Sequence, residues 1–473
     1  MAELTLEPVS APGTEADNRG AIVGALMLAI GLAAIDSTIV ATAVPQIVAD
    51  LGGFSLFPWI FSIYLLTQAV TVPIYGRLSD VFGRKPVLLV GVAGFLVGSV
   101  LCAVAWSMVT LIVFRGLQGL AAGAILPTTT TIVGDLYEPA ERGKVQGWIS
   151  SVWGVSAIVG PTLGGNNAEY WTWRGIFWLN LPIGVGAAWL IQRHLHERVE
   201  RRTHRIDYAG AFTLTASCSL LILALLEGGV SWAWGSTTSI ALFAGSAVLL
   251  VAFIQIERTV AEPILPLWVF RHRILVAGNV AGLAIGAILI GQTTYVPTYA
   301  QRVVGVGAVV AGLAMATMTI GWPIAATLAP RVYLRIGYRP TGLLGGSIAT
   351  VACLLFALFV GAGSGIWRVS VAGFVLGVGL GFISVSTVVA VQSTVGWARR
   401  GVVTGTNMFI RTLGSAVGVA VFGSIANARL AHRSHTGPAI FHAVHGVFWA
   451  LVVVAVLGIA GLLLFPQRVP QLD

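Results

Sequence analysis

The sequence is poor in charge. Only 10% of its 473 residues are Asp, Glu, Lys or Arg, while 56% are hydrophobic. Soluble globular proteins carry about 25% charged residues, so this chain cannot cover a surface that faces water. The mean hydropathy of +0.89 and the 58 glycines, which let membrane helices approach closely, predict an integral membrane protein.

The sequence also lacks the residues that enzymes and ATP-driven proteins need. It has no phosphate-binding loop of the type G-x-x-x-x-G-K-[ST], so ATP is not expected to supply energy. The three cysteines fall inside apolar runs, and no disulfide is implied: Cys102, Cys218 and Cys353. No nucleophile or acid pair stands out. The histidines near the last helix are not expected to bind metal: His432, His435, His442 and His445. We therefore predict no enzyme, no metal and no cofactor, with a proton gradient as the energy source.

Fourteen apolar runs are long enough to cross a bilayer as helices, since about 20 residues suffice. They lie at about 21–43, 55–75, 87–106, 109–133, 146–165, 175–191, 208–227, 237–256, 274–299, 308–329, 341–362, 368–393, 402–427 and 445–465. An uneven distribution of Lys and Arg orients such a chain, because these residues favour cytoplasmic loops.

Of the 27 Lys and Arg residues, 20 fall in the segments on the side of the N-terminus and 5 on the other side. The first 19 residues are polar and hold four acids, unlike a signal peptide. We therefore expect both termini in the cytoplasm and the chain in the inner cell membrane. The net charge of +9 then reflects topology, and no nucleic-acid partner is predicted.

One inner loop occurs twice in the chain, at an offset of 254 residues. The matching residues are Arg77, Gly83 and Pro86 in the first copy and Arg331, Gly337 and Pro340 in the second. The repeat predicts an all-α membrane fold with two six-helix bundles, at 1–192 and 274–473. A basic linker with two extra helices, at 193–273, lies between them. Parallel repeats of this kind place a substrate site at their interface, near the middle of the membrane.

Asp36 is the one acid that lies clearly in the middle of a predicted span. A carboxylate at that depth is costly and is by default a functional-site hypothesis. Asp36 lies about 22 Å above the inner start of its helix and Arg115 about 9 Å below the outer start of its own, at 1.5 Å per residue. In a hydrocarbon core of roughly 30 Å the two heights nearly coincide. They are expected to pair or to be bridged by polar groups, either for function or as a structural ion pair.

Besides the stretch Asp36-Ser37-Thr38-Ile39-Val40 of the first span, three further motifs resemble those of a known transporter family. The first is Gly76-x-Leu78-x-Asp80-x-x-Gly83-Arg84-Lys85, between the second and third spans. The second is Arg115-Gly116-x-Gln118-Gly119 in the fourth span. The third is in the fifth span and contains Gly154, Gly160, Pro161, Gly164 and Gly165. With 14 spans, the chain resembles the major facilitator superfamily, specifically its 14-helix drug:proton antiporter group.

The resemblance implies roles for these residues. Asp80 would face the N-terminal end of the thirteenth helix, near Gly401, and gate the inner side. Arg115 would take part in proton coupling, and a proton and a substrate would compete for Asp36. The glycines of the fifth span would form an antiporter motif. The alternatives are that Arg84 and Lys85 only mark topology, that Arg115 is satisfied by carbonyls, and that the glycines make an ordinary helix contact.

Several polar and aromatic residues are candidates for the substrate cavity, although aromatic side chains are more often packing or interface anchors. They are Trp59, Tyr64, Gln68, Trp153, Asn407 and Arg411. Arg411 has no carboxylate nearby in the sequence. It would either contact an anionic substrate or balance charge in the inner half.

Together these features predict a proton-coupled efflux antiporter for drugs or lipophilic compounds, working by alternating access. The expected substrate is a small lipophilic or cationic compound, the expected surroundings are the lipid bilayer, and a monomer is expected. Two alternatives remain open: an exporter or flippase of a lipid or cell-envelope precursor, and a transporter-like receptor or assembly factor. The sequence leaves the substrate, the proton stoichiometry and the role of the two extra helices undetermined.

Overall fold

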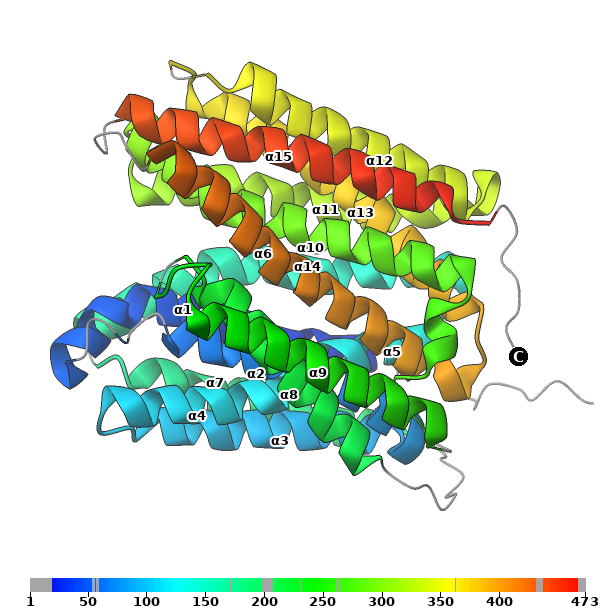
Figure 1. Cartoon of the computed structure of the whole chain (residues 1–473). Helices are drawn as coiled ribbons and strands as arrows, with labels where there is room; N and C mark the ends of the chain where they lie inside the picture. Colours follow the sequence, from blue (N-terminus) through cyan, green and yellow to red (C-terminus); the bar gives the residue numbers. More distant parts are fainter. Residues whose placement is uncertain are drawn as a thin grey trace, which may run out of the picture.

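The protein is built from long helices that lie roughly along one direction (Figure 1), as seen in a computed structural model. The structure describes residues 19–52, 56, 59–170, 172–197, 207–229, 231–260, 263, 265–361, 363–430 and 437–466. The basic linker predicted between the halves therefore lies partly outside the described residues, as do His432 and His435 of the last outer loop.

The main helices follow one another with short connections. They are α1 (Arg19–Leu51), α2 (Trp59–Phe82), α3 (Arg84–Ala103), α4 (Met108–Ala122), α5 (Ile125–Leu136), α6 (Pro139–Tyr170), α7 (Gly175–His194), α8 (Tyr208–Glu227), α9 (Thr237–Thr259), α10 (Arg273–Tyr299), α11 (Ala308–Ile336), α12 (Tyr338–Leu354), α13 (Ile366–Ser393), α14 (Arg400–Leu430) and α15 (Gly437–Leu463). Thirteen spans among the described residues are long and apolar enough to cross a membrane, with α4 and α5 counted as one. Helix α6 has 32 residues, which is long enough to cross the membrane as a fourteenth span.

The fourth span, predicted at 109–133, is a single span over Met108–Leu136 with a short break in its helix. Helix α4 ends at Ala122 and α5 begins at Ile125, while Gly123 and Ala124 between them keep right-handed helical backbone angles. A Cβ at Gly123 would lie 2.7 Å from the Gln68 carbonyl oxygen of α2. The break therefore lies where the span presses closely on its neighbour.

The two copies of the repeated loop have the same backbone turn. Gly83 precedes α3 with φ 95°, and Gly337 precedes α12 with φ 92°. Positive φ at this angle strongly favours glycine, which explains why both copies contain it at the same place.

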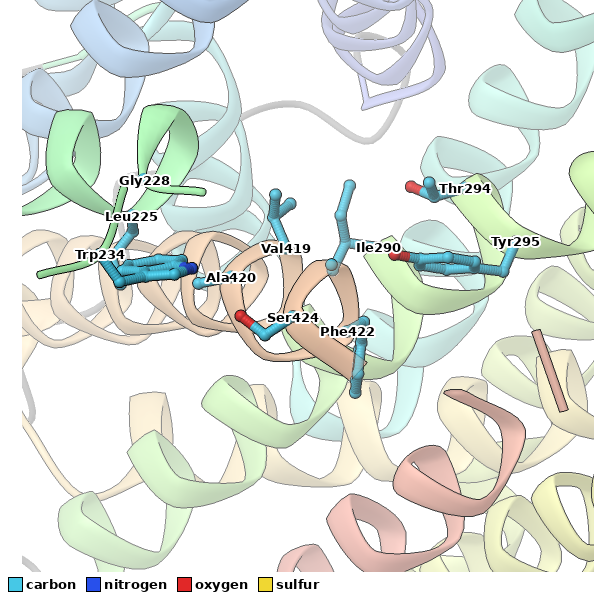
Figure 2. A pocket seen from close by; sticks show the side chains of 11 residues that line it. Leu225, Gly228, Trp234, Ile290, Thr294, Tyr295, Val419, Ala420, Phe422 and Ser424 are labelled. Atoms are coloured by element: carbon cyan, nitrogen blue, oxygen red, sulfur yellow. The ribbon is translucent and has the colours of Figure 1, made fainter. Parts of the chain in front are cut away.

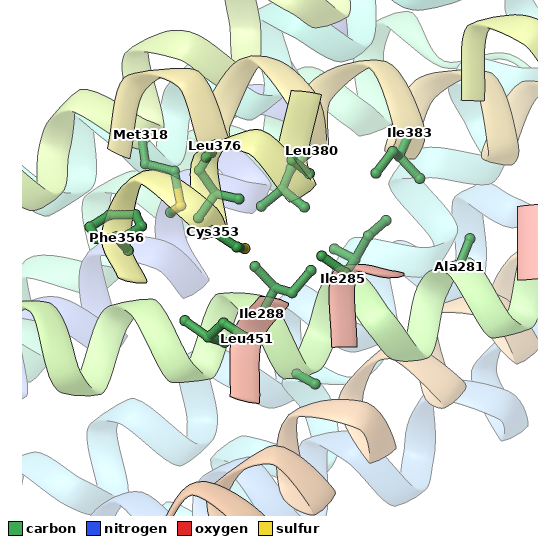
Figure 3. Close-up of a cluster of buried hydrophobic side chains, with 14 of the residues drawn as sticks. Ala281, Ile285, Ile288, Met318, Cys353, Phe356, Leu376, Leu380, Ile383 and Leu451 are labelled. Atoms are coloured by element: carbon green, nitrogen blue, oxygen red, sulfur yellow. The ribbon is translucent and has the colours of Figure 1, made fainter. Parts of the chain in front are cut away.

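Each end of the chain forms its own packed group of helices. In the first, α1 packs on α6 and α7, and α3 packs on α4 and α7. In the second, α13 packs on α11 and α12, and α10 packs on α14 and α15. Figure 3 shows part of the second core, where Ile288, Phe356, Leu376 and Leu451 come from four different elements. Cys353 is buried in this core, and all three cysteines are free.

Helix α14 crosses from one group to the other, as the diagonal orange helix of Figure 1 shows. It packs on α10 and α15 within its own half and on α2 and α5 of the other half. Helix α8, one of the extra pair, contacts both α2 and α14, where Cys218 and Ile222 join Phe409 in one apolar cluster. The extra pair therefore covers a seam between the halves.

The contact between α10 and α14 depends on glycine. A Cβ on Gly286 would lie much closer to the Arg411 carbonyl oxygen than any real Cβ contact, and a Cβ on Gly414 would do the same at the Leu283 carbonyl. The two backbones thus touch at two points along the pair, as small residues allow in membrane helices.

We predict that Gly286→Ala lowers the thermal unfolding temperature of the purified protein, because overpacking costs about 1–3 kcal/mol. The control is Gly312→Ala in α11, where an added Cβ meets nothing within 4 Å. Since alanine is the better helix former, this control is expected to be neutral or stabilising. Equal melting temperatures for the two variants would contradict the close contact.

Candidate functional site

Asp36 of α1 and Arg115 of α4 form a buried ion pair. Arg115 Nη1 donates to Asp36 Oδ2 at 2.6 Å. The exposed fractions are 0% for Asp36 and 1% for Arg115. The depths calculated from the sequence placed the two residues at one height, and in the structure they touch.

Two amide side chains complete the shell around the carboxylate. Gln118 Nε2 and Asn180 Nδ2 donate to Asp36 Oδ1 at 3.1 and 2.9 Å. Gln118 Oε1 also accepts from Arg115 Nη1 at 2.7 Å, and Asn180 contacts Ser99 Oγ at 2.9 Å. We call Asp36, Arg115, Gln118 and Asn180 the carboxylate cage.

Local structure explains how α4 supplies two members of the cage. Arg115 and Gln118 are three residues apart and so lie on one face of the helix. The start of α4 is fixed by a capping box between Ser107 and Thr110. The ring of Tyr64, a cavity candidate, instead lies 4.2 Å from the Arg115 guanidinium carbon. Tyr64 is 2% exposed, so it belongs to the cage surroundings.

Gln118 and Asn180 were not predicted from the sequence to lie at the site of Asp36. The position of Gln118 could have indicated its role, because Gln118 lies about one helical turn after Arg115 in the same motif. For Asn180 the sequence offers only a polar residue inside an apolar span, because its partner Asp36 is 144 residues away.

The cage lies inside the first helical group, enclosed by α1, α3, α4 and α7. Asp36 has no exposed surface, so a substrate cannot reach it in this conformation. The predicted direct competition between a proton and a substrate for Asp36 would therefore require a different conformation, in which the carboxylate is exposed.

Asp80 joins the two halves on the inner side. Its Oδ1 accepts from the Gly401 backbone N–H at 2.9 Å, and its Oδ2 accepts from the Val402 N–H at 2.8 Å. These amides are at the N-terminus of α14, which is the thirteenth span. Such an end carries roughly half a positive charge and unpaired N–H groups, so a carboxylate is well suited to it.

Arg84 connects this contact to a second carboxylate. Its Nη2 donates to Asp80 Oδ1 at 2.9 Å and to the Trp397 carbonyl at 2.6 Å. Its Nε lies 2.9 Å from Asp135 Oδ2. Arg400 Nη1 of α14 donates to Asp135 Oδ1, also at 2.9 Å.

We call Asp80, Arg84, Asp135 and Arg400 the inner clamp. Asp135, near the end of the fourth predicted span, was not predicted from the sequence to take part in this contact.

The remaining residues of the loop motif divide between the clamp and local structure. A Cβ at Gly76 would lie 2.7 Å from the Gly401 carbonyl oxygen, so glycine is needed where α2 meets α14. Lys85, predicted as a gating residue, donates to the Gln192 carbonyl at the end of α7. It thus ties α3 to α7 within one half, because successive residues of a helix point about 100° apart and Lys85 leaves the helix in another direction than Arg84.

The antiporter motif in α6 is described in part. Gly154 faces Thr319 of α11, the partner helix in the other half, and its added Cβ would lie 3.2 Å from the Thr319 hydroxyl. Helix α6 continues through Gly160, Pro161, Gly164 and Gly165, but their surroundings lie outside the described residues.

Two of the cavity candidates, Asn407 and Arg411, have different contact partners in the structure. Asn407 donates from Nδ2 to the Gly278 carbonyl at 2.7 Å and so holds α14 to α10. Arg411 lies with its guanidinium carbon 5.3 Å from the centre of the Trp322 ring. Trp59 and Gln68 are half-buried and Trp153 is exposed. Among the described residues, no hydrogen bond, ion pair or ring contact joins them to Asn407 or Arg411.

One cavity among the described residues is lined by no residue of the cage. It has a volume of about 110 Å³ and lies between the α8–α9 connection, α10 and α14. Figure 2 shows Trp234 and Tyr295 on opposite sides of it, with Ser424 of α14 between them. It marks where the extra helices meet the second half, toward the outer ends of these helices.

Asp50 forms a separate clamp at the outer end of the first half. It accepts from Trp173 Nε1 at 2.9 Å and from Arg174 Nη1 at 2.6 Å. These hydrogen bonds hold the pKa of Asp50 below its usual range. The carboxylate therefore remains ionised at neutral pH and is unsuited to carry a proton.

A fourteen-span membrane fold, with two halves clamped on one side and a charged cage within the membrane, defines a membrane transporter rather than an enzyme. Comparison with known families agrees. The profile of the Major Facilitator Superfamily matches residues 26–419, and the chain belongs to this family. The family predicted from the loop motifs is thereby confirmed.

Relatives and solved structures support this assignment. The chain is 35% identical over 404 residues to multidrug resistance protein 3 of Bacillus subtilis (strain 168), covering 85% of this chain and 79% of that protein. It is 34% identical over 411 residues to multidrug transporter protein MdtP of the same organism, covering 87% and 76%.

The human organic anion transporter MFSD10 (TETRAN) has a similar structure, with a TM-score of 0.66 over 93% of this chain and 100% of that one. Its sequence identity is 16%, so this likeness shows the fold alone.

We predict that Asp80→Asn opens the inner side more often. Asn offers an N–H group where a carboxylate oxygen accepted from Val402, and hydrogen bonds to charged groups contribute about 1.5–3 kcal/mol each. A cysteine introduced as Ser79→Cys, at a buried position of the clamp, should react with a membrane-impermeant maleimide about tenfold faster or more in the variant.

Glu141→Gln serves as the matched control, because Glu141 is an exposed inner-side acid with a loose 3.7 Å contact to Arg19. Labelling should be unchanged there. Equal labelling rates in Asp80→Asn and Glu141→Gln would contradict a closing role for the inner clamp.

Proposed function

We propose that the protein is a proton-coupled antiporter that exports drugs or other lipophilic compounds by alternating access. The observation that carries the proposal is the carboxylate cage: one acid, fully enclosed at mid-membrane depth and balanced by one arginine. The names of the relatives, multidrug resistance protein 3 and multidrug transporter protein MdtP, support efflux of drugs.

Protonation of Asp36 is the proposed coupling event. A neutral carboxyl group no longer balances Arg115, and an unpaired buried charge is strongly destabilising, by about 3–5 kcal/mol when a pair is broken. The helices around the cage must then rearrange to give Arg115 new partners or water. This is how a proton could drive motion without touching the substrate.

Two spans connect the cage to the inner clamp. Helix α2 contains both Tyr64, beside Arg115, and Asp80, about 24 Å further along at 1.5 Å per residue. The span of α4 and α5 contains both Arg115 and Asp135. We propose that a shift of these spans on protonation loosens or tightens the clamp and so exposes the centre to one side of the membrane at a time.

We also propose a location, an oligomeric state and an energy source for the protein. The protein is expected in the inner cell membrane with both ends in the cytoplasm, because Lys and Arg are concentrated on that side. One chain supplies both the cage and the clamp, which supports a monomer as the working unit. The proton gradient supplies the energy, and no cofactor and no nucleic acid take part.

We predict that Asp36→Asn abolishes efflux driven by a pH gradient in inverted membrane vesicles, because the side chain can no longer gain and lose a proton. Exchange of labelled for unlabelled substrate should persist, since the amide resembles the protonated acid in shape. Asp50→Asn, on the same helix but in the outer clamp, is the control and should retain driven efflux. Driven efflux at the wild-type rate in Asp36→Asn would refute the coupling role.

A further inference from the structure

We propose that Arg411 and Trp322 form a recognition site for an anionic group, and that the exported compounds therefore include lipophilic anions such as aryl sulfonates or carboxylates. This inference deepens the efflux function proposed above and rests on it. It departs from the lipophilic or cationic substrate that the sequence suggested.

Both residues lie near the middle of the membrane. Arg411 is 11 residues from the start of α14, about 16 Å along the helix at 1.5 Å per residue. Trp322 is 14 residues from the start of α11, about 21 Å by the same measure. Both are half-buried, in contrast to Arg115 with its 1% exposure, so part of their surface stays accessible.

The side chain of Arg411 spans two helices that have other main neighbours. Helix α14 packs mainly on α10 and α2, and α11 packs mainly on α13 and α6. The backbone of Arg411 faces α10, with its carbonyl against Gly286, while its guanidinium lies over Trp322 of α11. The side chain thus reaches from α14 to α11, two helices that are not packed closely on each other.

Arg411 has no counter-charge. Within the described part of the chain its guanidinium makes no hydrogen bond or ion pair, and its contact is the Trp322 ring. Residues 263–472 contain no Asp or Glu at all, so the second half cannot supply a carboxylate. Asp36, the mid-membrane acid of the first half, is already held by the cage.

The two most deeply buried arginines, unlike Arg411, each pair with a carboxylate. Arg84 contacts Asp80 and Asp135, and Arg115 contacts Asp36. A cation within the membrane normally pairs with another group of the protein. Arg411 lacks one and remains accessible, so an anion brought by the substrate is the natural partner.

The chemistry of the two side chains indicates the kind of anion. A guanidinium binds carboxylate, sulfonate or phosphate oxygens through two parallel N–H groups. The indole ring beside it offers an apolar face for stacking on an aromatic ring. An aromatic compound with one acidic group fits both, whereas an organic cation would meet a like charge.

The first test compares three naphthalenes of matched shape with the full-length protein in lipid nanodiscs. They are naphthalene-2-sulfonate, naphthalene-2-sulfonamide and 2-naphthyltrimethylammonium, which are anionic, neutral and cationic. Equilibrium dialysis should show the sulfonate binding about tenfold more tightly than the sulfonamide, and the ammonium compound most weakly. This comparison needs no variant, so it does not depend on whether a variant folds.

The second test uses variants. Arg411→Gln should remove the preference for the sulfonate, and Arg411→Lys should keep part of it, because lysine retains the charge without the fork. Arg429→Gln is the matched control: Arg429 is an exposed arginine at the outer end of the same helix and donates to the His442 carbonyl. It should bind all three compounds as the wild type does.

Equal or undetectable binding of the sulfonate by the wild type, or an unchanged preference in Arg411→Gln, would overturn the anion site. Efflux assays with the same compounds separate this failure from failure of the transport proposal. Export of the neutral or cationic compound but not of the anion overturns the anion site alone. If a pH gradient drives export of none of the three, or of a wider drug panel, the efflux function itself is wrong.

Discussion

The buried carboxylate of Asp36 constrains how the helices of the first half pack. A carboxylate in a medium of low dielectric is stable only with an opposite charge and with hydrogen bonds to its remaining lone pairs. Arg115, Gln118 and Asn180 provide these from α4 and α7. The positions of α1, α4 and α7 therefore depend on the charge of one side chain. A change in that charge alters the contacts among all three helices.

The inner clamp uses the same chemistry for a different purpose. There the carboxylates of Asp80 and Asp135 join elements from opposite halves, at the N-terminus of α14 and through Arg400. Glycine at positions 76 and 401 lets the two backbones come close enough for these bonds to form. Polar groups hold the contact and small residues permit it, so neither feature would close the inner side by itself.

Much of the fold could be predicted from the sequence because hydrophobic length and charge asymmetry act locally. Each span is recognisable from its own composition, and the repeated loop with Gly83 and Gly337 is visible in the letters. The pairing of Asp36 with Arg115 followed from depth alone.

Contacts between distant helices could not be predicted in this way. Nothing in the sequence brings Asn180 to Asp36, or Asp135 to Arg400, because these contacts depend on helix rotation and packing. The same limit applies to Asn407 and Tyr64, whose contacts with Gly278 and Arg115 could not be read from the sequence. It also explains why the enclosure of Asp36, which rules out direct contact with a substrate in this conformation, emerged only from the structure.

The two repeats share their geometry but not their charges. Gln292 of α10 lies 256 residues after Asp36, and Gly373 of α13 lies 258 residues after Arg115, offsets close to the 254 of the repeated loop. The equivalent positions are again neighbours, since a Cβ on Gly373 would lie 3.5 Å from Gln292 Nε2. Gln292 is fully buried, and among the described residues its amide has no hydrogen-bond partner.

The second half therefore keeps the architecture of the cage without the acid and the base that would let it titrate. With no acid between positions 262 and 473, this half cannot bind a proton at mid-membrane depth on a carboxylate. It does contain a cation there, at Arg411. In the function proposed above, this division of charge would place the proton in the first half and recognition of the substrate in the second.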